Sequence, residues 1–231
     1  MFAGVLGRLL RAAELAGVRG RVRCVICEWK GLEFRPLVGP GWMQRNARCP
    51  GCGAVQRQRL LAFAVSANRL AGRVLWVAPE ECLRRTLDNS DMEVITADLS
   101  MPGVDIQADI ERLPFHSGTV ACLVISDVLE HVVDDQRALQ EMRRVLADRG
   151  VALVHVPILT TETVEYGFAN EGEWGHRRAY GPDIVRRFGD ASLELSAYRA
   201  DQFSRRDQRR HGLLDWDAVL VATRADGERE C

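Results

Sequence analysis

The sequence contains no candidate membrane span, because no stretch of 18 uncharged apolar residues, about the minimum for a transmembrane helix, occurs among its 231 residues. We also expect no export signal. In the opening MFAGVLGRLLRAAELAG, Arg8, Arg11 and Glu14 interrupt the apolar run, and the apolar residues follow helical spacing. We expect an amphipathic helix over residues 1–19 that docks on the chain's own core, with a membrane or a partner as the alternative. We also expect a cytoplasmic protein with reduced cysteines.

Net charge is nearly absent, since 31 basic and 32 acidic residues give a formal charge of −1. The two signs are nevertheless unevenly distributed. Residues 19–60 carry nine Arg or Lys against two Glu, whereas residues 61–231 carry 20 basic and 29 acidic residues. The basic front segment would attract phosphate or carboxylate groups, although a solvated surface without a ligand has the same composition.

Cysteines are few, but four of the seven are clustered. Cys24, Cys27, Cys49 and Cys52 form two Cys-x-x-Cys pairs separated by 21 residues, the pattern of a four-cysteine zinc ribbon. Two tight turns would place four thiolates in a tetrahedron around zinc. Since four protein ligands leave no position for water, the zinc is expected to be structural. The alternative is four reduced thiols without a metal.

Internal repeats are also absent, and after residue 55 short apolar runs alternate with helical patterns, as is typical of a parallel α/β sheet. Helices are expected over 55–70 and over 135–150, the second ended by Gly150 with Arg143, Arg144 and Arg149 near its negative end. Strands are expected over 73–78, 92–100, 105–110, 120–129 and 151–157, with 193–200 and 217–224 as an antiparallel closing pair.

The segment ADIERLPFHSGTVACLVISDVLEHVVDDQRALQEMRRVLADRGVALVHVP, residues 108–157, resembles the class I S-adenosylmethionine-dependent methyltransferases, and the resemblance spans about residues 72–225. More narrowly, ARCPGCGAVQRQRL, VLWVAPE, VITADL and WGHRRAYG resemble a bacterial group with an N-terminal four-cysteine zinc ribbon. The resemblance implies an α/β fold, a Rossmann-like seven-stranded methyltransferase sheet preceded by a small zinc-ribbon module. It places the ribbon and the start of a linking helix at 20–60 and the methyltransferase domain at 61–231.

The same resemblance implies where S-adenosylmethionine binds, at the carboxyl ends of the strands. Asp98 would accept hydrogen bonds from both ribose hydroxyls, because a fixed carboxylate offers two acceptors to a diol. Asp109 would contact the adenine amino group, and Ile110 would cover a face of the ring. The expected cofactor contacts are Ala78, Pro79, Glu80, Asp98, Leu99, Asp109, Ile110, Ser126 and Asp127.

The first loop departs from the family pattern, since it lacks the usual acid and the glycine-rich turn. Trp76 stands at the position of the acid, and Pro79 and Glu80 must shape the turn. Glu80 would then pair with the ammonium group of the cofactor. This departure keeps a non-catalytic, methyltransferase-like binding protein as an alternative.

Residues expected to act on the acceptor follow the fourth and fifth strands. His131 is a candidate general base because imidazole titrates near neutrality, with a scaffold or capping role as the alternative. His176 and Tyr180 are further catalytic candidates within ANEGEWGHRRAYG, a segment expected to form a mobile acceptor lid, with an ordinary surface loop as the alternative. Substrate contacts are expected from Trp174, Arg177 and Arg178, as an aromatic wall and two anion-binding forks.

The sequence therefore indicates a methyltransferase acting on a small-molecule or glycan acceptor, with an anionic acceptor as a hypothesis from charge alone. The ribbon is expected to border the acceptor pocket. The main alternative is an RNA methyltransferase whose ribbon binds phosphates. Trp29, Phe34 and Trp42 are the ribbon's aromatic residues, too few for a base-stacking platform. Because the expected catalytic body is acidic, the small acceptor is favoured.

Overall fold

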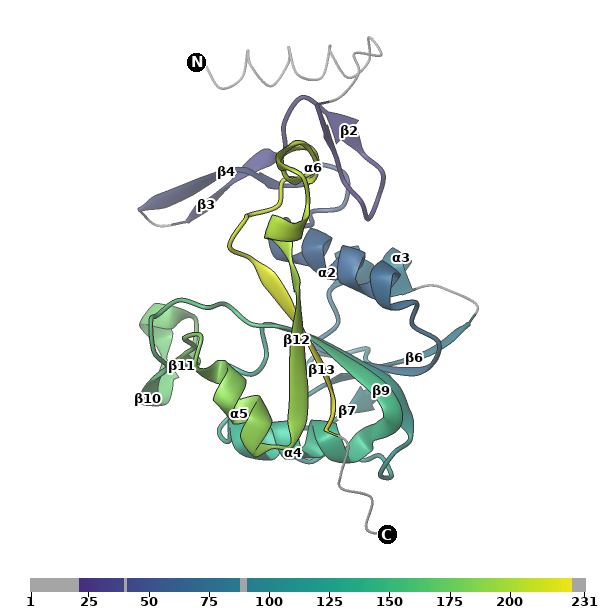
Figure 1. The fold of residues 1–231 in the computed structure, drawn as a ribbon. Helices are drawn as coiled ribbons and strands as arrows, with labels where there is room; N and C mark the ends of the chain where they lie inside the picture. The colour runs from purple at the N-terminus through teal and green to yellow at the C-terminus, as the bar shows by residue number, and fades with distance from the viewer. Residues whose placement is uncertain (1–20, 40, 88–90, 226–231) are drawn as a thin grey trace. The chain divides into compact units, whose positions relative to one another are not determined.

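The computed structural model describes residues 21–39, 41–87 and 91–225 (Figure 1). The amphipathic helix predicted over residues 1–19 lies outside these ranges. The chain divides into two compact units. The ribbon unit combines residues up to 66 with 81–86 and 199–218, and the sheet unit combines 67–80, 87–198 and the residues from 219 onward. The units thus interleave along the chain and do not follow the predicted division at residue 60.

Two small antiparallel sheets carry the cysteine pairs of the ribbon unit. β1 (Val22–Arg23) pairs with β2 (Lys30–Gly31), and the turn between them holds the first cysteine pair. β3 (Arg35–Gly39) pairs with β4 (Trp42–Arg48), which leads into the second pair. The predicted helix then follows as α2 (Gln56–Asn68). Cores this small depend on metals or disulfides for stability, which fits the cysteine cluster.

Arg59, on α2, holds separate parts of the ribbon unit together, and its side chain is fully buried. Its guanidinium donates to Ala47 O at 2.9 Å and to Ala54 O at 2.7 Å. It also donates to His211 O at 2.6 Å and to Gly212 O at 3.0 Å, the carboxyl end of α6 (Arg205–His211). Burial lowers the pKa of Arg59 to about 10, so the group remains charged at neutral pH.

The sheet unit contains a seven-stranded sheet in the order β12-β13-β9-β8-β5-β6-β7. The strands from β7 to β9 are parallel, and β13 runs antiparallel to β9. The seven predicted strands and the pairing of the last two are confirmed. Their bounds are β5 Gly72–Val77, β6 Met92–Asp98, β7 Ile106–Gln107, β8 Val120–Ser126, β9 Leu146–His155, β12 Leu193–Arg199 and β13 Ala218–Arg224.

The central strands are apolar along their length because both faces of a parallel sheet are covered. Six of the seven residues of β8 are buried. α4 (Asp135–Val145) begins where the side chain of Asp134 accepts a hydrogen bond from Arg137 N, as Asp commonly does at a helix start. The helix buries one apolar stripe in the core and lies beside α5 (Ile184–Asp190), as Figure 1 shows. The stripe consists of Ala138, Leu139, Met142 and Val145.

The predicted helix over 135–150 is too long. α4 ends at Val145, and Leu146 is already extended and paired with Val120 of β8. Arg149 therefore belongs to β9, and Gly150 does not end the helix. The structure also contains short elements that were not expected, namely η1 Glu81–Leu83, α3 Arg84–Leu87, β10 Val164–Asn170, η2 Glu171–Glu173, β11 His176–Ala179, α5, η3 Ala200–Gln202 and α6. Within the described ranges, none of the helices has the length and apolar character needed to cross a bilayer.

Candidate active site and metal centre

A cavity of about 400 Å³ opens at the carboxyl ends of β5, β6 and β8. This is where α/β sheets bind ligands, and the volume lies within the usual range for small-molecule sites. Six of the nine expected cofactor residues line the cavity, and two of the expected acceptor-side residues, His131 and Arg177, also line it. The lining is Val77, Ala78, Asp98, Leu99, Ser100, Ala108, Asp109, Ile110, Glu111, Asp127, Val128, His131, Val132, Val133 and Arg177.

The loop after β5 keeps a glycine-like backbone without a glycine. Ala78 has a φ of 51°, a left-handed conformation that costs an L-residue roughly 1–2 kcal/mol. Its amide donates to Ala97 O at 2.9 Å, which ties the turn to β6. Trp76, at the position of the usual acid, is 2% exposed and packs inside the sheet unit. Pro79 and Glu80 do not line the cavity, so the structure does not bring them to the expected site.

Two carboxylates stand on the cavity wall. Asp98 Oδ1 accepts from Ser100 N at 2.8 Å and from Met101 N at 2.7 Å. These bonds fix the carboxylate, and within the described ranges its Oδ2 keeps its hydrogen-bonding capacity for a ligand. Asp109 Oδ1 accepts from Glu111 N at 2.9 Å. The two groups come from the ends of neighbouring strands, as the sequence predicted, and a pair of fixed acceptors suits a ligand rich in donors.

The end of β8 supplies a carboxylate paired with a histidine. Asp127, with a φ of 53°, has its Oδ1 2.8 Å from His155 Nδ1, and its amide donates to His155 O at 3.0 Å. Ser126 is buried and does not line the cavity. His155 was not among the residues expected at the site; its signal in the sequence is a single histidine at the end of an otherwise apolar strand.

The acceptor side of the site contains a second group of titratable side chains. Ligand atoms of Glu130, His131 and His176 all lie within 4.8 Å of one another. The two imidazole rings are edge to face with centroids 4.7 Å apart, and Arg177 N donates to Glu130 O at 2.7 Å. Burial, and then the proximity of His131, lower the pKa of His176. His176 is therefore neutral at pH 7, the form in which imidazole accepts a proton.

Tyr180 and Arg178 lie in the protein interior and not in the cavity. The hydroxyl of Tyr180 donates to Asp135 Oδ2 at 2.8 Å and lies 3.1 Å from Leu129 O, and its side chain is 1% exposed. The guanidinium of Arg178 donates to three backbone carbonyls, at positions 129, 132 and 133, and pairs with Glu165. Both side chains are used to hold β11 on the loop after β8. Their predicted places at the acceptor are therefore corrected.

The predicted lid contains regular structure, since β10 and β11 form an antiparallel hairpin. In a strand, neighbouring side chains face opposite sides, and this turns His176 and Arg178 inward while Arg177 reaches the cavity. Trp174 precedes the strand, is 68% exposed, and its ring centroid lies 6.0 Å from that of His176. Trp174 is thus available to a ligand beside the cavity.

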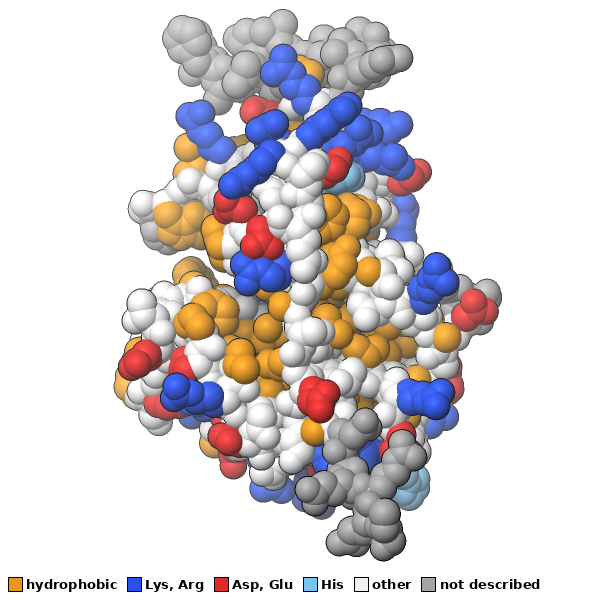
Figure 2. Space-filling view, viewed as in Figure 1, with side chains coloured by type: hydrophobic (Ala, Val, Ile, Leu, Met, Phe, Trp, Pro, Cys, Tyr) orange, Lys and Arg blue, Asp and Glu red, His pale blue; other side chains and the backbone are white. Residues whose placement is uncertain are grey.

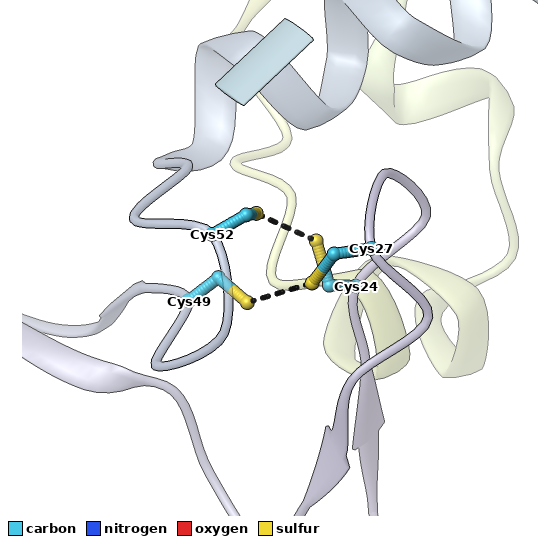
Figure 3. A group of neighbouring side chains, drawn as sticks. All are labelled: Cys24, Cys27, Cys49 and Cys52. Atoms are coloured by element: carbon cyan, nitrogen blue, oxygen red, sulfur yellow. Dashed lines mark hydrogen bonds between the residues drawn. The ribbon is translucent and has the colours of Figure 1, made fainter. Parts of the chain in front are cut away.

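The four cysteines of the ribbon converge as predicted, with their side chains pointing toward one another (Figure 3). Cys24 Sγ lies 3.7 Å from Cys52 Sγ, and Cys27 Sγ lies 3.5 Å from Cys49 Sγ. Zinc–sulfur bonds of about 2.3 Å in a tetrahedron require sulfurs about 3.8 Å apart, so the donor set fits zinc. Gly51 N donates to Cys49 Sγ at 3.3 Å, as expected for a turn that holds a thiolate.

The strand order, with one antiparallel strand inserted beside β9, and the site at the carboxyl ends of the strands define the class I methyltransferase fold. Residues 49–154 match the family described as "Methyltransferase domain". This match covers a little under half of the chain and agrees with the methyltransferase resemblance seen in the sequence.

Solved structures share this fold at low identity. A Burkholderia thailandensis 1,6-didemethyltoxoflavin-N1-methyltransferase, with bound 1,6-didemethyltoxoflavin and S-adenosylhomocysteine, gives a TM-score of 0.54 at 14% identity, over 74% of this chain and 79% of that chain. The [4+2]-cyclase SpnF gives 0.54 at 16% identity, over 74% and 81%. These likenesses concern the fold alone, and the second protein, a cyclase, illustrates that one fold supports different reactions.

A relative with a higher identity comes from Streptomyces fradiae. The "Uncharacterized 37.1 kDa protein in transposon TN4556" is 32% identical over 121 residues, which cover 50% of this chain and 31% of that protein. The match thus spans about a third of the relative's length.

Proposed function

We propose that the chain transfers the methyl group of S-adenosylmethionine to a small-molecule or glycan acceptor. The observation that carries the proposal is the cavity whose lining combines the fixed Asp98 and Asp109 carboxylates with His131 and Arg177. The cofactor supplies an electrophilic methyl group on a sulfonium. An acceptor lone pair attacks the methyl carbon, the bond to sulfur breaks, and its electron pair stays on sulfur.

Each residue has a defined task in this proposal. Asp98 accepts from the ribose hydroxyls, and Asp109 with Ile110 holds the adenine. His131 or His176 takes the acceptor proton, since both lie beside the cavity and the pKa of His176 is lowered. Arg177 offers a guanidinium to an anionic acceptor, and we assign Trp174 to the acceptor's apolar face.

Zinc in the ribbon has a structural role in this proposal. The four cysteines would fill the coordination sphere, so the ion holds the two turns together and supplies no open position for chemistry. We also infer a reducing, cytoplasmic compartment, in which cysteines stay available to zinc.

Calorimetry with S-adenosylhomocysteine tests the cofactor site. Asp98→Ala should weaken binding by about 1–3 kcal/mol, the range for lost hydrogen bonds to a charged group. Asp148→Ala is the matched control, because Asp148 lies on β9 outside the cavity and its side chain is 95% exposed. Equal affinity of the two variants would place the ribose elsewhere. No binding by the unaltered protein would favour the non-catalytic alternative without this cofactor.

A second candidate, an RNA methyltransferase, is favoured by a basic groove in the ribbon unit. Four arginines line this groove: Arg21 of the ribbon, and Arg206, Arg209 and Arg210 of α6. Among the described lining residues, Glu33 is the one acidic residue. Figure 2 shows Lys and Arg side chains gathered around α6. The arginines of α6 thus add to the basic character that the sequence predicted for residues 19–60, and such a surface suits phosphates.

The two candidates are separated by binding and turnover. At physiological salt, a labelled RNA should not shift with the protein if the acceptor is small, and a screen of small acceptors should detect release of S-adenosylhomocysteine. An RNA shift that is lost in Arg206→Ala and Arg209→Ala, together with methylation of that RNA, would instead establish the second candidate.

A further inference from the structure

The group of Glu130, His131 and His176 has the composition of a metal site that is separate from the cysteines. Its three ligand atoms lie within 4.8 Å of one another. They come from two segments, the loop after β8 and the start of β11, which the hydrogen bond from Arg177 N to Glu130 O at 2.7 Å holds together. The fold therefore brings His176 from a distant part of the sequence to the adjacent residues Glu130 and His131.

His176 carries the observation that points to a ligand. Its side chain is buried, with 7% exposure, and its Nδ1 has no hydrogen-bond partner among the described residues. Buried polar atoms are nearly always bonded, and an exception calls for an explanation such as a bound ion. Glu130 beside it is 1% exposed, and buried carboxylates are typically paired or coordinate a metal.

We propose that Glu130, His131 and His176 bind a divalent first-row transition metal. Two imidazoles and one carboxylate are a donor set found for zinc and for non-haem iron. Three protein ligands leave at least one coordination position open. Because His131 lines the cavity at the ends of the strands, the open position faces the space where a ligand binds.

The role of this ion, unlike the site itself, rests on the proposed methyl transfer. A metal-bound hydroxyl loses its proton more readily, so the ion selects acceptors that coordinate through oxygen. The acceptor hydroxyl releases its proton to solvent as it binds the ion. The resulting oxygen attacks the methyl carbon, and the electron pair of the broken bond stays on the cofactor sulfur. With the ion bound, the two histidines hold it and the proton leaves to solvent; without the ion, His131 or His176 takes the proton as proposed above.

Cobalt titration of the full-length, untagged protein tests the site. The cysteines are first saturated with zinc, and Co²⁺ is then added without cofactor while the visible spectrum is recorded. We expect one further equivalent, with the weak bands of nitrogen and oxygen ligation and without the intense bands of thiolate ligation. His131→Ala and His176→Ala should each weaken this binding by at least about tenfold, whereas His116→Ala should not change it.

His116 is a suitable control because it is exposed and does not line the cavity. His131 is also exposed, so its replacement leaves the core intact. Absence of the second equivalent, thiolate bands, or binding that survives both His131→Ala and His176→Ala would overturn the proposal. Calorimetry with S-adenosylhomocysteine on the same sample keeps the two questions apart, since cofactor binding without cobalt binding refutes only the metal site.

Discussion

Replacing Arg59 by Met should destabilise the ribbon unit more than any exposed substitution in it. The change removes the donors of four hydrogen bonds to backbone carbonyls. Bonds from a charged group contribute about 1.5–3 kcal/mol each, although bonds made by one side chain do not add fully. Ala54 O also accepts from the amide of Cys49 at 2.8 Å, so this carbonyl keeps a partner in the variant.

The cost of burying the charge offsets part of this stabilisation. Burial lowers the pKa of Arg59 from 12.5 to about 10, which corresponds to about 3 kcal/mol. The net loss expected for Arg59→Met is therefore about 3–5 kcal/mol. Arg59→Lys keeps the charge and loses the planar fork, so it should lose about half as much.

Urea unfolding of the zinc-loaded protein measures this loss, with zinc release to a chromogenic chelator as the signal for the ribbon unit. With a slope of about 2 kcal/mol per molar, the midpoint for Arg59→Met should fall by roughly 2 M. Arg48→Met is the matched control, because Arg48 is exposed on β4 next to Ala47. Equal midpoints for the two variants would refute the assignment of Arg59 as the residue that joins α2, the second cysteine turn and α6.

Three further predictions concern the metal, the hydrogen bonds of the sheet unit and pH. Elemental analysis of the unaltered protein should find about one tightly held zinc per chain. Cys49→Ser should contain no zinc, and in urea its ribbon unit should no longer unfold cooperatively. Tyr180→Phe should cost about 0.5–1.5 kcal/mol of stability and leave S-adenosylhomocysteine affinity unchanged by calorimetry; a loss of affinity at full stability would return the residue to the site. The hydrogen bond from Arg144 holds the pKa of Glu141 below its usual value, so the stabilisation that this pair gives is present above about pH 4.5 and lost as the pH falls below it. In Glu141→Gln, the urea midpoint should therefore decline less between pH 5 and pH 3 than in the unaltered protein. The control Glu171→Gln should show the same decline as the unaltered protein.

The sheet could be predicted from the sequence because its strands are short apolar runs whose pattern depends on local composition. Asp98 and Asp109 both line the cavity because the carboxyl ends of parallel strands meet at one edge, and their contacts with the cofactor stay a prediction. The two cysteine turns could be predicted too, because each Cys-x-x-Cys pair lies within four residues and few structures other than a tight turn bring its two sulfurs together. In each case the residues that matter lie within a few positions of the pattern that reveals them.

The other features of the fold and the site could not be predicted, because they depend on contacts between residues that are far apart in the sequence. The loop expected at His176–Ala179 forms β11, so alternate residues face opposite sides and Tyr180 enters the core. The pairing of Asp127 with His155 joins the ends of two strands 28 positions apart. α6 was missed because a seven-residue helix rich in arginine has no apolar periodicity, and its packing against the ribbon unit supplies the stability.

The interleaving of the two units has a consequence for synthesis on the ribosome. The carbonyls of His211 and Gly212 are 152 and 153 positions from Arg59. At about 5–20 residues per second, they emerge on the order of 10 s after the cysteines. The segment that completes these hydrogen bonds therefore reaches the nascent ribbon only after the residues of the sheet unit up to position 198 have been made. A fragment that stops there would contain every cysteine ligand and still lack the segment that completes the buried hydrogen bonds, so the ribbon cannot be excised as a contiguous N-terminal piece.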